Sequence, residues 1–323
     1  MDRRVDVQHC WFLGPIVISL GTMAQNGGVG LPWFERMVTT DAPPQDLGTR
    51  AIPVESVNHL FKSVESRLGT SAIAAWAEDA ALTQTSPLSL HWGEPSIEDV
   101  VKRVAETSLL DHNIAATGTF DTADHLTIFL LPIEGTPKWV HVFFLALLAE
   151  GITKYNEDPD LVEDLGLGGM PGQLLSGRVD SRYWNELSTV LTKPSWVRFR
   201  KSALTADTVF ASESWARMTR SMLNPVVGWR FRTSSWRYKT AVFFCNEIAR
   251  TSELNMPKAA EFMNVDVSTL RRHLSIEGTS FRKLLAEFRM SLGHILRIQN
   301  LTDREVSSLL GFSSSASLKR LNL

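Results

Sequence analysis

Residues 256 to 296 constrain the fold of this chain most, because local signals fix where two short helices begin, turn and end. Asn255 can cap the first helix by accepting from a free amide of its first turn, and Pro257 is tolerated there. Asn264 follows where a tight turn needs left-handed backbone, which asparagine accepts more readily than most residues. The stretch therefore predicts a short helix followed by an abrupt change of direction.

The second helix of the pair begins at Asp266, whose carboxylate can accept from the amides of its own first turn. Leu270 and Leu274 share one side of this helix and form its buried seam, and Gly278 ends it. At or beside the outer face remain Thr269, Arg271, Arg272 and His273. Two short helices with a basic second member predict a helix-turn-helix.

A longer helix is predicted to start near Phe281. Its apolar stripe consists of Phe281, Leu284, Leu285, Phe288, Leu292, Ile295 and Leu296. Thr302 and Glu305 then form a capping box for a further helix, which ends at the turn Gly311-Phe312-Ser313. Arg289 on the long helix is expected to have a structural role.

In order, spacing and turn residues, the stretch from about 235 to 323 resembles the DNA-binding domain of the AraC/XylS family of bacterial transcription regulators. That family carries two helix-turn-helix units joined by one linker helix. The resemblance implies an all-α domain that binds promoter DNA. DNA binding needs cations for the phosphates and polar side chains on a helix that enters the major groove.

The resemblance also implies which side chains contact DNA. The first recognition helix would present Ser268, Thr269, Arg271 and Arg272, and the second Ser315, Ser317, Lys319 and Arg320. Arg272 is the side chain most expected to reach a base or a phosphate. Asn322 stands where the family has an aromatic residue, and Ser307 where it usually has alanine. We therefore expect an apparently truncated, frayed second unit and a DNA footprint dominated by the first.

The charge of the chain is unevenly distributed. From Arg237 onward it holds 13 Lys and Arg against 8 Asp and Glu, a net charge of +5. The whole chain carries −2, so the preceding residues carry −7. A basic module on an acidic body is what phosphate binding by one end requires, although a solvated helical face has the same composition.

The preceding part, about residues 10 to 220, predicts a mixed α+β domain. Its expected helices cover 54 to 68, 71 to 82, a segment capped by Ser96 with Asp99, and 139 to 155. Its expected strands are a hairpin of 114 to 120 with 125 to 131, and 196 to 200. Expected loops are 21 to 50, with a short helix near 32 to 38, and the glycine-rich 166 to 172. The helix after Gly93-Glu94-Pro95-Ser96, the hairpin and the next apolar helix loosely resemble the arabinose-binding-like sensor domain of some AraC-family regulators.

Catalytic and metal-binding patterns are missing from the sequence. The eight histidines are scattered outside any HExxH or CxxC setting, and no GxSxG element or nucleophile–base pair stands out. We therefore expect no metal, no cofactor and no enzymatic activity. Cys10 and Cys245, the two cysteines, lie in different predicted domains, which fits a reducing cytoplasm. The apolar segment 139 to 155 carries His141 and Glu150, which favours a buried helix over a membrane span.

The sequence thus predicts a cytoplasmic transcription regulator of the AraC type. A first domain (10 to 220) would sense a small molecule or form a homodimer, and a second (236 to 323) would bind double-stranded promoter DNA. One alternative is a truncated regulator that acts as a dimerisation module with little DNA binding of its own. Another is an enzyme with a helical appendage.

Overall fold

The computed structural model describes residues 11–30, 51–69, 72, 75–76, 91, 93–110, 112–133, 136–154, 158, 160–172, 174–175, 178–179, 190–208, 211–248, 254–312 and 318. Over these ranges the chain forms a mixed α+β part followed by an all-α part, which confirms the predicted fold class. Of the described helices, none is long and apolar enough to cross a membrane.

A five-stranded antiparallel sheet organises the first part, with strand order β3-β4-β11-β6-β7. Its strands are β3 (Ala115–Asp121), β4 (His125–Pro132), β11 (Ser195–Arg200), β6 (Val162–Leu167) and β7 (Met170–Pro171). Side chains alternate between the two faces, as the pleat requires. Leu126, Ile128 and Leu130 of β4 join one core cluster, whereas Phe129 and Leu131 join another.

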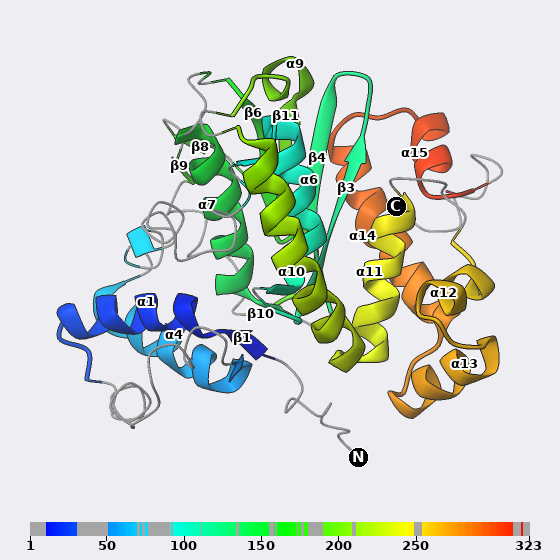
Figure 1. Ribbon diagram of the computed structural model, residues 1–323, viewed down its shortest axis with the longest axis horizontal. Helices are drawn as coiled ribbons and strands as arrows, with labels where there is room; N and C mark the ends of the chain where they lie inside the picture. The colour runs from blue at the N-terminus through cyan, green and yellow to red at the C-terminus, as the bar shows by residue number, and fades with distance from the viewer. Residues whose placement is uncertain are drawn as a thin grey trace.

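The first face of the sheet is covered by helices of the first part (Figure 1). Of these, α6 (Ile97–Thr107) and α7 (Lys138–Lys154) lie on the sheet, and α1 (Gly14–Asn26) and α4 (Val54–Leu68) extend the same core away from it. Phe61 of α4 stacks on Trp139 of α7, with ring centroids 4.2 Å apart. Ser96 caps α6 by accepting from the amide of Asp99, as predicted.

The second face is covered by helices of the C-terminal part, so the two parts share a core (Figure 1). Phe120, Phe129 and Trp196 of the sheet lie in one cluster with α11 (Trp236–Ile248). Gly118 of β3 permits the close approach of α11, because a Cβ there would lie 2.8 Å from the Cβ of Cys245. The C-terminal helices are therefore anchored to the sheet through α11.

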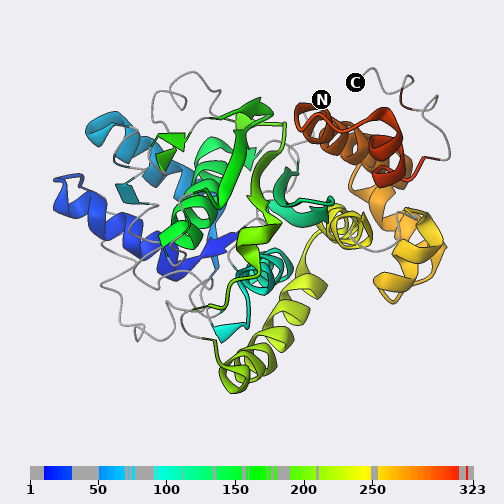
Figure 2. The same cartoon turned by 90° about the horizontal axis from the view of Figure 1, so that it is seen from above.

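In the described C-terminal part, four more helices follow α11 and pack around the same cluster of buried residues. They are α12 (Met256–Phe262), α13 (Val267–Ile276), α14 (Phe281–Ile298) and α15 (Asp303–Leu309). Before them, α10 (Glu213–Thr233) leads from the first part into α11. Figure 2 shows α10, the yellow-green helix, at the rim of the molecule.

Small elements complete the fold. Two-residue and three-residue strands pair as β1 (Trp11–Leu13) with β2 (Ala51–Pro53), β5 (Thr136–Pro137) with β10 (Val190–Leu191), and β8 (Leu174–Leu175) with β9 (Arg178–Val179). A 3-10 helix, η3 (Ser108–Leu110), follows α6, and α9 (Lys201–Leu204) follows β11.

Two sequence predictions for the first part were wrong. Residues 21 to 26, expected as loop, belong to α1, which extends the apolar segment before them. The stretch 166 to 172, expected as loop, is a hairpin of β6 and β7, and the turn falls at Gly168 and Gly169, both with positive φ. The expected helices at 32 to 38 and, for the most part, 71 to 82 lie outside the described residues.

Candidate nucleic-acid interface

The first helix of the expected helix-turn-helix, α12, is capped as the sequence predicts. The side chain of Asn255 accepts from the amide of Lys258 at 3.0 Å, and Pro257 occupies the first turn. Ala259 and Ala260 are buried against the neighbouring helices. Small apolar side chains on this face let α12 pack closely while its opposite face stays in solvent.

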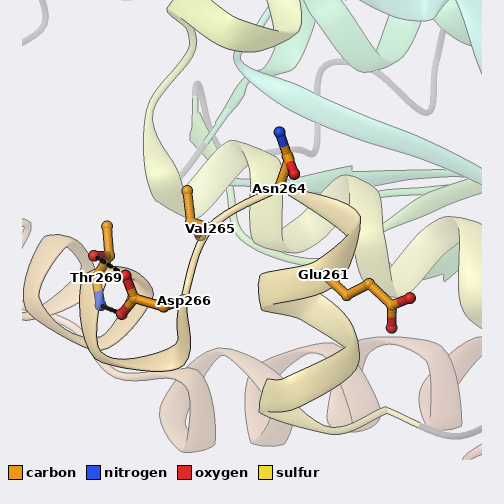
Figure 3. Close-up of a pocket in the computed structure, with 5 residues that line it drawn as sticks. All are labelled: Glu261, Asn264, Val265, Asp266 and Thr269. Atoms are coloured by element: carbon orange, nitrogen blue, oxygen red, sulfur yellow. Dashed lines mark hydrogen bonds between the residues drawn. The ribbon is translucent and has the colours of Figure 1, made fainter.

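The turn between the helices depends on Asn264, whose φ is 55°. This left-handed residue ends α12, and the amide of Val265 then donates to the carbonyl of Ala260 at 2.9 Å. Figure 3 shows Asn264, Val265 and Asp266 following one another between the two helices, with Glu261 on α12. These four residues and Thr269 line an open depression beside the turn. The chain thus changes direction within three residues, which is the tight turn expected between the two helices.

Asp266 caps α13 through several hydrogen bonds at once. Its carboxylate accepts from the hydroxyl of Ser268, and from the amide and hydroxyl of Thr269, both at 2.7 Å. The hydrogen bonds from Ser268 and then Thr269 hold the pKa of Asp266 well below its usual range. Because both hydroxyls donate to Asp266, Ser268 and Thr269 can offer DNA an acceptor oxygen but no spare hydroxyl proton in this arrangement.

Arg271 and Arg272 are exposed on the outer side of α13, as predicted. Leu270 and Leu274, on the inner side, are fully buried. Among the described residues, neither arginine forms an ion pair. The structure therefore brings together the four residues expected on the first recognition helix, and leaves two guanidinium groups facing solvent.

The other side of α13 is fastened to the start of α11. The ring of His273, which is expected at or beside the outer face, stacks on Trp236, with centroids 4.3 Å apart and planes 10° apart. The carboxylate of Glu277 accepts from the backbone amides of Trp236 and Arg237 at 2.8 and 2.9 Å. Glu277 therefore caps α11 from a distant point in the sequence, and fixes the orientation of α13.

Sequence reasoning missed both Glu277 and Trp236. Each is separated from its partner by about forty residues, and neither sits in a local motif. Trp236 at the start of a helix and a carboxylate just after another helix are both ordinary on their own. Their relationship is visible only once α11 and α13 lie side by side.

Helices α14 and α15 lie where the linker helix and the start of the second unit are expected. Thr302 and Glu305 form the predicted capping box of α15. Arg289 of α14 donates through Nε to the carbonyl of Leu310 at 2.9 Å, and lies over the ring of Phe312. Arg289 therefore holds the end of α15, in agreement with its expected structural role. Outside the described residues lie Ser315, Ser317, Lys319 and Arg320, the side chains expected on the second recognition helix.

A cavity of about 280 Å³ lies where the first part, α10, α11 and α12 meet. We call it the junction cavity, and its lining includes Thr117 of β3, Gly228 of α10, Tyr238 of α11 and Phe262 of α12. The hydroxyl of Thr117 is buried and has no hydrogen-bond partner within the described ranges. The lining combines aromatic rings with the amide side chains of Asn224 and Asn246, which suits a small, largely apolar ligand with a hydrogen-bonding group.

Comparisons with known proteins give one distant likeness. No family model matches the chain, and no curated protein matches it. Its structure is similar to one described as the crystal structure of transcriptional regulator CdpR from Pseudomonas aeruginosa, at 15% sequence identity and a TM-score of 0.39. The similarity covers 94% of this chain and 93% of that chain. A likeness at this level carries no functional argument, so function must be inferred from the local geometry.

Proposed function

We propose that this protein is a sequence-specific DNA-binding transcription regulator of the AraC type that acts in the cytoplasm. The observation that carries the proposal is the α12–α13 helix-turn-helix, with Arg271 and Arg272 exposed on its second helix. Caps, turn and buried seam all hold α13 so that one face stays outward. The proposal requires no cofactor and no catalytic step.

In this proposal α13 enters the major groove of promoter DNA while α12 lies across the backbone. A guanidinium group can bind the O6 and N7 atoms of guanine with two hydrogen bonds, or bind a phosphate. Arg271 and Arg272 can each bind a guanine or a phosphate in this way. The hydroxyl oxygens of Ser268 and Thr269 can accept hydrogen bonds from base amino groups. The contact of Glu277 with α11 keeps α13 in a fixed position relative to the sheet.

A gel-shift experiment with the upstream intergenic DNA tests this proposal. The purified chain should shift that fragment in the presence of excess unrelated DNA, and Arg271→Ala with Arg272→Ala should abolish the preference. The alternative, a dimerisation module with little DNA affinity of its own, predicts a stable mixed dimer with an intact relative and no shift. A specific shift would favour the DNA-binding regulator, and a mixed dimer without a shift would favour the dimerisation module.

We further propose that a small effector acts through the junction cavity. The cavity is lined by elements of both parts, so an occupant would contact α6, α10 and the helix-turn-helix together. Its aromatic walls and the amide side chains of Asn224 and Asn246 favour an uncharged ring compound with one or two hydrogen-bonding groups. A ligand that binds one arrangement of these helices more tightly would shift the DNA affinity.

Gly228 provides a test of this effector site. A Cβ at Gly228 would meet only Arg232 within 4 Å, so a leucine there can extend into the cavity without a backbone clash. Leucine also has a higher helix propensity than glycine. Gly228→Leu should therefore leave DNA binding intact while it abolishes any thermal shift caused by a panel of phenol, indole and benzyl alcohol. A ligand that shifts both proteins equally binds elsewhere.

A further inference from the structure

A hydrogen bond joins α14 to the turn of the β6–β7 hairpin. Nε2 of His294 donates to the carbonyl of Gly169 at 2.6 Å. The two segments approach closely, because a Cβ at Gly169 would lie 3.2 Å from that nitrogen and 2.6 Å from Cδ of Lys193. Gly169 also has a φ of 83°, which residues with a side chain rarely adopt. The contact between the turn and α14 therefore requires glycine at this position.

The turn is itself bound to β11. The amide of Gly168 donates to the hydroxyl of Ser195 at 2.9 Å. The amide of Gly169 donates to the carbonyl of Pro194 at 2.7 Å. The Ser195 hydroxyl is also hydrogen-bonded to Nδ1 of His141 at 2.7 Å, and both of these side chains are fully buried. A continuous series of hydrogen bonds therefore runs from α7, in the core of the first part, through β11 and the turn to α14.

Helix α14 is attached to the sheet at a second point. The hydroxyl of Thr127 on β4 donates to Oε1 of Gln299, the C-cap residue of α14, at 3.3 Å, and both residues are buried. In the sheet, β4 and β6 lie on opposite sides of β11. The two hydrogen bonds therefore attach the C-terminal half of α14 to different strands, and α14 cannot tilt against the sheet without breaking one of them.

The position of α14 affects the helices on both sides of it. Phe281 and Phe288 of α14 lie in the same buried cluster as Leu270 and Leu274 of α13. Arg289 of α14 holds the end of α15 through the carbonyl of Leu310. Because these contacts are close-packed or hydrogen-bonded, a shift of α14 would also move α13 and α15.

We propose that His294 is a positioning residue for DNA binding, which through the Gly168–Gly169 turn makes the DNA affinity of the C-terminal helices depend on the arrangement of α7 and β11. This inference rests on the DNA-binding function proposed above. Contiguous hydrogen bonds and packed side chains can carry such coupling. A binding surface that is already held in position binds more tightly, because less freedom is lost on binding. Without the His294 hydrogen bond, part of the binding free energy would be used to restore the position of α13.

A role in folding alone predicts a different result. If His294 only stabilised the fold, its loss would lower the urea midpoint and leave the DNA affinity of the folded protein unchanged. The positioning role predicts a lower affinity for the specific site even where the variant is fully folded. Binding to unrelated DNA depends mainly on phosphate contacts, which tolerate imprecise positions, so it should change less.

Three variants of His294 test the proposal by fluorescence anisotropy with the promoter fragment, under conditions where circular dichroism shows each variant folded. His294→Ala should weaken specific binding by about three- to thirtyfold. His294→Gln keeps a donor nitrogen near the position of Nε2 and should bind like wild type. His294→Asn places its nitrogen near the position of Nδ1, out of reach of Gly169, and should bind like the alanine variant. His59→Ala removes an exposed histidine from α4 and is the matched control.

Ser195→Ala tests the other end of the series, because it removes the acceptor of the Gly168 amide. It should weaken specific binding in the wild-type background and change it little in the His294→Ala background, where the connection to α14 is already broken. If Ser195→Ala does not fold, the order of the three His294 variants decides alone.

The outcomes separate this inference from the proposed function. Specific binding by the wild type with equal affinity in His294→Ala, equal affinities of the Gln and Asn variants, or additive effects of Ser195→Ala and His294→Ala would each overturn the positioning role and leave the DNA-binding function standing. Absence of specific binding by the wild type would refute the DNA-binding function, and the positioning role with it.

Discussion

Individual arginines in this structure fall into two groups according to their partners. Arg220, Arg230 and Arg289 each bind a carboxylate or backbone carbonyl, and so stabilise the fold. Arg271 and Arg272 are exposed, with no ion pair in the part of the chain that the structure describes. A guanidinium group that the fold does not use can bind a ligand without loss of stability. The DNA contact is therefore expected on α13.

Arg272→Ala should weaken specific DNA binding by about 1–3 kcal/mol and leave the urea midpoint unchanged, because the side chain makes no described contact within the fold. Fluorescence anisotropy with a labelled promoter fragment at fixed salt measures this effect. Arg67→Ala removes an exposed arginine from α4, far along the chain from the helix-turn-helix, and is the matched control. Equal affinities for the Arg272 variant and wild type would remove this residue from the interface.

Gly118 tests whether the sheet and α11 pack as closely as described. A Cβ at this position would lie 2.6 Å from the ring of Phe129 and 2.8 Å from the Cβ of Cys245. Gly118→Ala should therefore cost about 1–3 kcal/mol of unfolding free energy through overpacking. Gly30→Ala, where nothing lies within 4 Å, should change stability little. Urea unfolding of both variants checks the difference.

Local signals explain which elements were predictable from sequence. The bounds of α12 and α13 and the turn between them were predicted in detail, since Asn255, Asn264, Asp266 and Gly278 act on neighbouring backbone. The long helix α14 was predicted because its apolar stripe repeats over its whole length.

The elements that escaped prediction depend on distant contacts or conflicting patterns. No periodic pattern indicated α10. Its exposed Trp215, Met218 and Trp229 each stand directly before a buried residue, so the sequence shows no single apolar side. Pro225, inside the helix, also argues locally against it. The stacking of His273 on Trp236 was not predicted, because it is a tertiary contact.

Glu277 should couple the stability of α11 to that of α13. Glu277→Ala leaves the amides of Trp236 and Arg237 without their acceptor, and should lower the unfolding free energy by about 1–2 kcal/mol. Glu277→Gln keeps one acceptor oxygen and should have a smaller effect. Glu261→Ala, an exposed acid on α12, serves as the control. Urea unfolding followed by Trp fluorescence measures the order of the three, and equal midpoints would contradict the capping role.

At the scale of the whole molecule, the pH dependence of stability is set by three buried, neutral histidines in the first part. Burial lowers the pKa of His91 and His112 to about 4, and that of His141 to about 3. His141 keeps a hydrogen bond to the Ser195 hydroxyl at 2.7 Å. In the unfolded chain each histidine titrates near pH 6.5. Below that pH the unfolded state binds more protons than the folded state.

Stability should therefore be full above about pH 6.5 and fall as the pH is lowered toward 5. Each of the three histidines contributes a slope of about 1.4 kcal/mol per pH unit in the lower part of this range. Urea unfolding at pH 7.5, 6.0 and 5.0 gives the slope. His141→Gln should reduce it by about a third. A free energy of unfolding that is constant from pH 7.5 to 5.0 would show that these histidines are not buried neutral.

The measurement that tests the central claim most directly is a footprint on the upstream intergenic DNA with a salt titration. We expect protection of a discrete site that survives competitor DNA, with affinity that falls steeply as salt rises. Arg271→Ala with Arg272→Ala should remove the protection and make the salt dependence shallower, by about one unit of slope for each phosphate that the double variant no longer binds. No protected site, or protection unchanged in the double variant, would contradict the assignment of α13 as a DNA-recognition helix.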